Sequence, residues 1–533
     1  MQFRGDLYND RNPKPRRINI ELTIDQPVAQ ENGIASGLSY QYLSAVTFVA
    51  AGGIFYIVVA KLLPTSALGA ISLLLAIASL MNVAFSFGFP AAATHFISFH
   101  LGTGDHNETR SVARKILVIS VVLSLVSLAF TLVTARWFAI LFFHNPYDTP
   151  LIEAASFYIA IGVLFGVLHG SALGFQMFRA DAIIYLSSAS LSYIVGLVLL
   201  LVFHGIIYLI IGLTLSYMYG SAFYVYYVFI RKPKGRVISS KTSLPLILSY
   251  SWPVTLSGLI GYGSSYVDRF VVAYYLNLST LGIYSFILIV FSSLSFLSGP
   301  ISNVLVPKLS EYFSNDDSDK MTNGMNLSSI VTVLIYSPIA MGLAAVAPVA
   351  LMLLARQIYA TGYIALIILL GTSSIFVLDG VLSSVIYAIR KTRVYVVTTT
   401  LTLASNVALS FLLIPRFGMM GAAVANSSVM VVTYIVLYHY AVRTKLKNFD
   451  WNTVLKLWFS SLVMFVMVTA ERMLLGNFIH LLPLYVLSGV FYYWIAINLT
   501  RSLRNLKREE FLSYIPSRFN FRRIVSLFLV KAF

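Results

Sequence analysis

The sequence predicts an all-α integral membrane protein with about fourteen transmembrane helices, and three observations support this prediction. Hydrophobic residues make up 58% of the chain and charged residues only 11%, whereas about a quarter of the residues of a soluble protein are charged. Apolar runs of about twenty residues recur along the whole length, and each could cross a hydrocarbon layer of about 30 Å as a helix. Basic residues, finally, gather in alternate connections between these runs.

The apolar runs define the candidate spans in chain order. These are 41–62, 68–92, 113–134, 153–174, 183–203, 207–230, 247–270, 281–305, 327–347, 363–388, 394–414, 420–441, 453–474 and 479–499. The connections between them are short, so no loop could house a soluble catalytic domain.

The distribution of basic residues predicts the orientation. With the N-terminus inside, all but six of the 37 Lys and Arg residues fall on the cytoplasmic side. The six exceptions are Lys61, Arg136, Arg269, Arg356, Arg416 and Arg472. By the positive-inside rule we expect a multi-pass protein of the cytoplasmic membrane with both termini cytoplasmic. The net charge of +17 then reflects topology and contact with lipid, and nucleic acid is not an expected partner.

An internal repeat relates the two halves of the chain. A shift of about 213 residues pairs Gly205 with Gly418. It also lays Ala60, Leu63, Ser66, Leu68 and Gly69 on Ala273, Leu276, Ser279, Leu281 and Gly282. Because this offset covers six spans, an even number, the two halves have the same orientation in the membrane. The repeat predicts two six-helix lobes with a central cleft, as in a rocking transporter, although apolar helices also resemble one another by chance.

These observations divide the chain into five segments. A polar tail, 1–40, lacks the features of a cleavable signal peptide. The two lobes are expected at 41–245 and 246–445, and the last two spans at 450–500. The C-terminal segment, 501–533, mixes apolar and basic residues as an interfacial amphipathic helix does, and an ordinary cytoplasmic cap is the alternative.

Charged residues within the predicted spans are candidate functional residues, since a charge in the bilayer is costly. Asp268 and Arg269 lie in the seventh span, where the repeat places Phe55 and Tyr56 in the other half. Side chains of adjacent helical residues point about 100° apart, so the two ions cannot simply neutralise each other. Both a structural tie to neighbouring helices and a substrate or coupling role fit this pattern.

Two further acids lie within or near the ends of spans. Asp379, in the tenth span, could reach a proton, an ion or another helix, and a buried hydrogen bond is the more frequent explanation. Glu471 and Arg472 lie near the end of the thirteenth span, where a surface position suffices.

The sequence shows no pattern of enzymatic chemistry. There is no cysteine, no phosphate-binding loop, no HExxH and no nucleophile elbow. Three isolated histidines have no metal-ligand spacing: His95, His169 and His204. We therefore expect neither a cofactor nor a metal, and a transporter rather than an enzyme.

Three stretches carry a family resemblance. They are IVVAKLLPTSALGAIS at 57–72; SWP, VDRF, LGIYS and VPKLS between 251 and 310; and Asn406 followed by LIPRFGMMGAAVA at 413–425. Together they resemble the polysaccharide flippases, the Wzx-type branch of the multidrug/oligosaccharidyl-lipid/polysaccharide superfamily. Lys61 stands where this family usually has an arginine.

The resemblance implies a V-shaped pair of six-helix lobes, two extra C-terminal helices and alternating access. The implied partners are a polyprenyl-(di)phosphate-linked oligosaccharide, membrane lipid and glycan-assembly enzymes, in the assembly of a surface polysaccharide or a glycoprotein glycan. A cation-coupled small-molecule exporter of the same superfamily is the alternative. It is less favoured, because that branch usually ends at twelve spans and often has an acid in its first span. A membrane glycan polymerase or ligase would need a larger outer loop.

An anionic lipid headgroup requires basic groups facing a wet cavity. Arg269 is the best-placed candidate, followed by Arg179, Lys308 and Arg390 near the predicted cytoplasmic ends of their spans. These three could instead anchor helices at the interface. We predict that Arg269 faces the cavity, while Asp268 points to a neighbouring helix and positions its own.

Overall fold

The computed structural model describes residues 51–231, 241–294, 299–315, 317–389, 391, 393–442 and 449–502, and every regular element in these ranges is a helix. The N-terminal tail and nearly all of the C-terminal segment lie outside them. A short apolar helix, Ala51–Leu62, comes first. The helices that follow are α2 (Thr65–Ser86), α3 (Phe89–Gly102), α4 (His106–Phe138), η1 (Ala139–Phe143), η2 (Pro146–Asp148), α5 (Thr149–Gly174), α6 (Phe178–Phe203), α7 (Ile206–Val225), η3 (Tyr226–Arg231), α8 (Leu244–Tyr275), α9 (Leu278–Ser292), α10 (Gly299–Ser314), α11 (Ser318–Ala345), α12 (Ala347–Leu354), η5 (Gln357–Gly362), α13 (Tyr363–Phe376), α14 (Asp379–Ala388), α15 (Arg393–Val442), α16 (Trp451–Leu475), η6 (Ile479–Leu481) and α17 (Leu482–Thr500).

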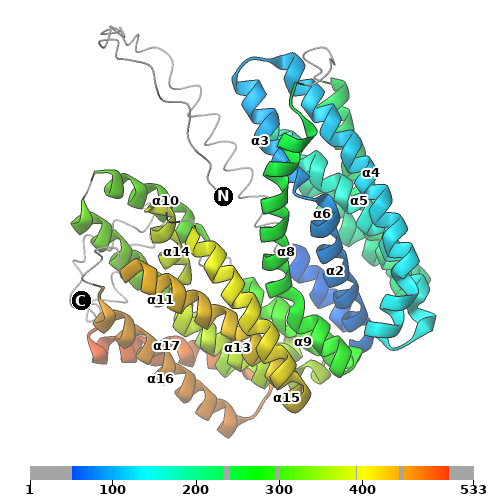
Figure 1. The fold of residues 1–533 in the computed structure, drawn as a ribbon. Coiled ribbons are helices and arrows are strands. Elements are labelled where there is room, and N and C mark those ends of the chain that lie inside the picture. The colour runs from blue at the N-terminus through cyan, green and yellow to red at the C-terminus, as the bar shows by residue number, and fades with distance from the viewer. Residues whose placement is uncertain are drawn as a thin grey trace, which may run out of the picture.

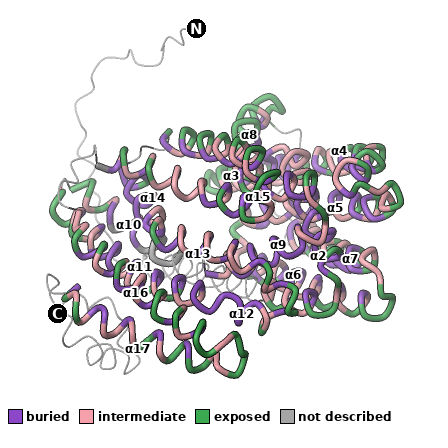
Figure 2. Tube along the Cα trace, turned by 90° about the horizontal axis from the view of Figure 1, so that it is seen from below, coloured by how far each residue is buried: buried purple, intermediate pink, exposed green. Residues whose placement is uncertain are grey.

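Large apolar side chains cover the outside of the helical bundle. Along α4 the exposed residues include Val121, Val122, Leu125, Val126 and Val133. Figure 2 shows exposed segments on the outer faces of peripheral helices such as α4, α7 and α17, and buried ones toward the interior. A water-soluble surface rarely carries continuous apolar stripes of this kind, so these faces are suited to lipid.

Eleven helical segments in the described part of the chain are long and apolar enough to cross a membrane, and two shorter apolar helices accompany them. The predicted all-α membrane class is therefore confirmed, but a count of fourteen crossings is not. The predicted span 281–305 divides between α9 and α10. Spans 394–414 and 420–441 both fall in α15, whose direction changes at Gly418, with φ 58° and ψ −135°.

Other predicted spans are broken where the backbone leaves the helical region. Phe87 and Gly88, at φ 47° and 68°, separate α2 from α3 within the predicted span 68–92. The positive φ of Gly88 carries no Cβ penalty, and Pro90 is the second residue of α3, where a proline is tolerated. Apolar character alone does not reveal such breaks.

The helices form two lobes (Figure 1). The first holds α2 to α7, and the second holds α8 to α15, with α16 and α17 against α11. The lobes separate toward α3 and α10, which we call the divergent end. They meet at the opposite end, the closed end, where α2 packs against α9.

The two lobes touch backbone to backbone at the closed end. A Cβ on Gly69 would lie 1.8 Å from the carbonyl oxygen of Leu278, and a Cβ on Gly282 would lie 1.9 Å from that of Thr65. The hydroxyl groups of Thr65 and Ser279 are hydrogen-bonded. Gly69 and Gly282 are the pair that the 213-residue offset relates, so the repeat brings equivalent residues face to face.

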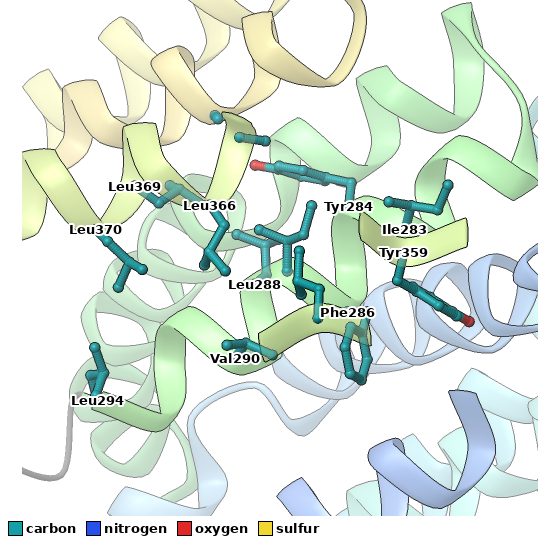
Figure 3. Packing of buried hydrophobic residues seen from close by; sticks show 14 of the residues in the cluster. Ile283, Tyr284, Phe286, Leu288, Val290, Leu294, Tyr359, Leu366, Leu369 and Leu370 are labelled. Carbon is teal, nitrogen blue, oxygen red and sulfur yellow. The ribbon is translucent and has the colours of Figure 1, made fainter. Parts of the chain in front are cut away.

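The buried core of the second lobe is centred on α9. Figure 3 shows side chains of α9 together with Tyr359 from η5 and leucines of α13. Tyr284, Phe286 and Tyr359 are fully buried, and the rings of Phe286 and Tyr359 lie 4.9 Å apart. In a bilayer such burial replaces contact with lipid rather than with water, so close packing supplies the stabilisation. This packing holds α9 against η5 and α13, behind the closed-end contact.

Candidate functional site

A central cavity of about 610 Å³ lies between the lobes. The first lobe contributes the helix Ala51–Leu62, α2, α5, α6 and α7, and the second contributes α8 and α9. Seven tyrosines line it: Tyr56, Tyr158, Tyr185, Tyr193, Tyr217, Tyr262 and Tyr266. Five serines join them: Ser79, Ser188, Ser192, Ser292 and Ser293. Because tyrosine presents an apolar ring face and a polar hydroxyl, this wall suits a ligand with both kinds of surface.

Several of these rings are stacked into flat platforms. The ring of Tyr217 stacks on that of Phe165 at a centroid distance of 4.7 Å and on that of Tyr158 at 5.0 Å. Across the cavity, on α8, Tyr262 and Tyr266 stack at 5.9 Å. Each lobe therefore presents its own aromatic surface to the same space.

Arg269 lies beside this wall. Its guanidinium carbon is 4.4 Å from the ring centroid of Tyr266, which itself lines the cavity. One of its terminal nitrogens donates to the carbonyl oxygen of Ser265 at 3.3 Å. The side chain is half-buried, so the charge is held over an aromatic face close to the cavity without belonging to its lining. Its part in substrate binding stays a prediction.

Asp268 is fully buried and directed away from the cavity lining. One carboxylate oxygen accepts hydrogen bonds from the Tyr284 hydroxyl at 2.5 Å and from the Asn426 amide at 2.9 Å. The other accepts from the backbone N–H of Arg269 at 2.9 Å. The carboxylate thus joins α8 to α9 and α15.

Of the three further basic candidates, only the side chain of Arg179 is described, and it does not line the central cavity. Arg179 is exposed and lines a separate pocket of about 820 Å³ at the divergent end, together with His106 and Gln176. Lys308 lies in α10, where its side chain is not among those described. Arg390 lies outside the described residues.

Asp379 and Glu471 lie in different surroundings. Asp379 is half-buried and is the first residue of α14, which two residues separate from the end of α13 at Phe376. An acid is stabilised in the first turn of a helix by the helix dipole. One carboxylate oxygen of Glu471 is buried and has no hydrogen-bond partner among the described residues. For both residues, a role in coupling stays a prediction.

The surface position expected near the end of the thirteenth span is wrong for Arg472. Its side chain is buried, with 6% exposed, and donates to the Asn477 side chain at 2.7 Å. The chain turns back after α16 at Gly476, whose carbonyl oxygen accepts from the Tyr485 hydroxyl of α17 at 2.6 Å. This turn encloses the guanidinium between the last two helices.

Sequence reasoning missed two buried acids. Asp181, with 1% exposed, accepts from the Tyr224 hydroxyl at 2.7 Å and lies 2.7 Å from Nδ1 of His169. Its position in a predicted connection made an acid there seem ordinary. Nothing in the twelve-residue spacing signals a contact with His169, which the sequence presented as an isolated histidine and which the structure places against Asp181.

Glu108 is the second missed acid, and it binds the connection between the lobes. It is buried, and its carboxylate accepts from the backbone N–H groups of Lys241 and Thr242 at 3.0 and 2.9 Å. It also accepts from the Thr242 hydroxyl at 2.8 Å. Lys115 of α4 donates to the Thr242 carbonyl oxygen at 2.7 Å. The start of the chain that leads into α8 is therefore fixed to the first lobe.

Comparison with known proteins identifies the family. The sequence profile of the family described as polysaccharide biosynthesis protein matches residues 58–360, more than half of the chain. The chain belongs to this family. A relative named as a probable low-salt glycan biosynthesis flippase, from Haloferax volcanii, is 21% identical over 276 residues. That alignment covers 51% of this chain and 57% of the relative, little more than half of either protein.

Solved structures share the fold. A lipid II flippase, MurJ, in an inward closed conformation matches with a TM-score of 0.69 and 17% identity, covering 88% of this chain and 99% of that one. An inward-facing multidrug resistance transporter of the MATE family matches with a TM-score of 0.61 and 16% identity, covering 75% and 94%. These structures confirm the predicted MATE-like fold.

Proposed function

We propose that this protein is a flippase that moves a polyprenyl-(di)phosphate-linked oligosaccharide across the cytoplasmic membrane by alternating access. The observation that carries the proposal is the central cavity, with its seven tyrosines and Arg269 behind one of them. Family membership and the flippase relative support it. The product would serve the assembly of a surface polysaccharide or a glycoprotein glycan.

The cavity fits the polar part of such a substrate. Sugar rings have apolar C–H faces and hydroxyl edges, and a wall of tyrosines with interspersed serines can stack on the first and hydrogen-bond the second. Arg269 can offer a planar fork of N–H donors to phosphate oxygens. Its present contacts are a ring face and one 3.3 Å hydrogen bond, which a phosphate could replace.

An apolar hollow supports a lipid-linked substrate. It measures about 500 Å³ and lies between α11, α12, α16 and α17, where Gly342 and Gly489 leave room. Its wall is almost entirely apolar, with Met464, Val468 and Tyr493 among the lining residues. A prenyl chain could lie here at low cost, because it would exchange one apolar environment for another.

Alternating access would use the two ends of the molecule in turn. We propose that the closed end faces outward and the divergent end faces the cytoplasm, as the distribution of basic residues requires. Because the chain has no cysteine, single cysteines at the exposed residues Tyr147 and Gln176 can test this orientation. An impermeant thiol reagent should label the first in intact cells and the second only after lysis, and the reverse result would refute the orientation.

A cation-coupled exporter of small molecules is the second candidate. The aromatic wall favours it, since tyrosine faces attract organic cations, and the fold is shared with a multidrug transporter. Arg269 opposes it, because a fixed positive charge beside the cavity repels a cationic drug.

Analysis of lipid intermediates in a deletion strain separates the two candidates. Loss of the flippase should cause the lipid-linked oligosaccharide to accumulate on the cytoplasmic leaflet and should deplete the finished glycan. Expression of the wild-type chain should return both to their normal amounts. Unchanged lipid intermediates together with a new drug sensitivity would instead establish the exporter. Interaction with glycan-assembly enzymes is part of the proposal, and co-purification from membranes of the native host can test it.

A further inference from the structure

A buried acid, a histidine and a tyrosine meet inside the first lobe. Asp181 lies in the first turn of α6, His169 on α5 and Tyr224 on α7. Nδ1 of His169 and the Tyr224 hydroxyl both lie 2.7 Å from the same carboxylate oxygen. Since a carboxylate only accepts, Nδ1 carries a hydrogen and donates it. We call these three residues the His169 cluster.

The His169 cluster lies between the pocket at the divergent end and the central cavity. On one side, Ala180 precedes Asp181 and lines the pocket at the divergent end. On the other side, Tyr185 lines the central cavity, and its ring centroid is 5.2 Å from that of His169. Phe165, also on the wall of the central cavity, lies 5.4 Å from Tyr224. The cluster is thus within one helical turn of both spaces.

The exposure of the partners suits exchange of a proton. The side chain of Asp181 is 1% exposed, whereas that of His169 is 29% exposed. Around them lies an apolar shell that includes Phe165, Leu168 and Val228. A carboxylate in such a place is costly without donors. The imidazole of His169 supplies a hydrogen-bond donor in both of its forms. The neutral form donates from Nδ1, and the protonated form donates from the same atom and adds a positive charge.

We propose that the His169 cluster is a proton-binding site that couples proton exchange to the movement of the lobes. The proton adds to Nε2 of His169 and leaves from the same atom, so no other group changes its covalent state. In the protonated form the imidazolium and the carboxylate attract each other and tie α5 to α6. Because α5 also packs against α2, which carries the closed-end contact with α9, acid favours the arrangement of the first lobe that is seen here, with the closed end shut.

Other titratable groups around the cluster do not duplicate this arrangement. Among the described residues, the titratable groups near it are Tyr185 and the exposed Arg179 on α6, Tyr217 on α7, Tyr227 on η3 and His106 at the start of α4. Tyrosine and arginine keep their protonation near neutral pH. His106 lines the pocket at the divergent end rather than contacting the carboxylate. His169 is therefore the group to test.

The test follows opening of the closed end and needs no substrate. In the otherwise cysteine-free chain, Ser279→Cys places a thiol in the contact between α2 and α9. Purified full-length protein in liposomes is treated with a maleimide reagent at about pH 5.5 and about pH 8, on either side of the usual histidine range. The reactivity of any thiol toward maleimide rises with pH. The labelling of Ser279→Cys is therefore divided by that of Tyr147→Cys, whose position is exposed, at the same pH. We expect labelling of Cys-substituted position 279 to be several-fold higher at the higher pH.

His169→Gln should remove this difference, because glutamine can still donate to Asp181 but does not titrate. His439→Gln is the matched control: His439 is exposed in the last turn of α15 in the other lobe, and its substitution should leave the pH response intact. A full pH response in correctly folded His169→Gln protein would overturn the proposal, as would its absence in the parent protein. Asp181→Asn provides a second check, since it leaves the histidine but removes its counter-ion, and should reduce the response.

The inference rests on the proposed function, yet the two can fail separately. If the deletion strain shows normal lipid intermediates, the flippase assignment fails whatever the labelling shows. If the lipid intermediates accumulate but His169→Gln retains the pH response, the flippase stands and the proton site is wrong.

Discussion

Two pairs of repeat-related positions behave in opposite ways. Gly69 and Gly282 are the same residue in both halves and meet backbone to backbone at the closed end. Phe55 and Tyr56 in the first half correspond to Asp268 and Arg269 in the second. The repeat is therefore kept where the lobes must fit against each other and lost where the cavity is built.

The difference follows from what each place requires. A contact between equivalent surfaces needs a shape that complements itself, and glycine allows the closest approach of two helices. A cavity for an asymmetric ligand gains nothing from symmetry. The central cavity has the aromatic pair Phe55 and Tyr56 on one side. On the other side, Arg269 lies beside a tyrosine ring and Asp268 anchors its own helix. We expect substitutions at the shared positions to act on movement and those at the divergent positions to act on binding.

The largest effect is expected for Gly282→Ala. The added methyl group would lie 1.9 Å from a backbone oxygen, which cannot move away as a side chain could. The closed end could not shut, and transport should fall by more than about tenfold, a change that corresponds to about 1.4 kcal/mol. Gly371→Ala is the control, because a Cβ there meets nothing within 4 Å. Lipid-linked oligosaccharide per inserted protein is the measurement, and equal transport by the two variants would contradict the contact.

Arg269→Ala should cost about tenfold or more in transport while the protein still accumulates in the membrane. Hydrogen bonds to charged groups contribute about 1.5–3 kcal/mol. Arg269→Lys should keep part of the activity, since the charge survives without the bidentate fork. Arg136→Ala, at an exposed position, serves as the control. Wild-type turnover by Arg269→Ala at equal abundance would remove this residue from the substrate site.

Asp268→Asn should mainly lower the amount of folded protein. The amide cannot accept all three hydrogen bonds that the carboxylate accepts, and a buried donor left without a partner costs about 1–3 kcal/mol. Size-exclusion profiles after mild heating in detergent measure the loss, and Tyr284→Phe should show a smaller one. Normal abundance combined with lost transport would move Asp268 from a structural to a functional role.

Tyr266→Leu should have the smallest effect. It removes the aromatic face beneath Arg269, a contact worth about 0.5–1 kcal/mol at a site of this exposure, or a change of about two- to fivefold. Tyr147→Leu, far more exposed, is the control. A loss as large as that of Arg269→Ala would show that the ring itself holds the substrate.

The sequence was sufficient for the class of fold and for the lobes. Apolar length and the repeat are properties of the chain itself, and the structure agrees with the all-α membrane class and the two lobes that they predict. The orientation predicted from the basic residues stays a prediction. The placement of Gly69 against Gly282 was not foreseen, although the offset pairs them, because a repeat does not state which equivalent surfaces touch. The break at Gly88 depends on backbone angles that hydropathy does not report. Gly418, in contrast, lies in the predicted connection between spans 394–414 and 420–441, where the structure has its kink.

The candidate site was predicted less completely. Asp268 and Arg269 stood out since ions are rare in apolar runs, but the partners of Asp268 on α9 and α15 lie far along the chain. Tyr284 was visible within a family-like stretch without any indication of its role. Asp181 escaped notice because its burial results from packing of three helices, and no local pattern marks it.

The hydrogen bonds that Glu108 accepts from Lys241 and Thr242 restrict how α8 can move. At its start this helix is held by the first lobe: Tyr250 stacks on His95 at 4.6 Å, and a Cβ on Gly88 would meet the Ser251 carbonyl oxygen at 2.4 Å. Further along, Ser264 and Asp268 are bonded to α15. One helix thus has contacts with both lobes. If the lobes move relative to each other as proposed, we expect α8 to bend within the stretch 258–263, which contains three glycines.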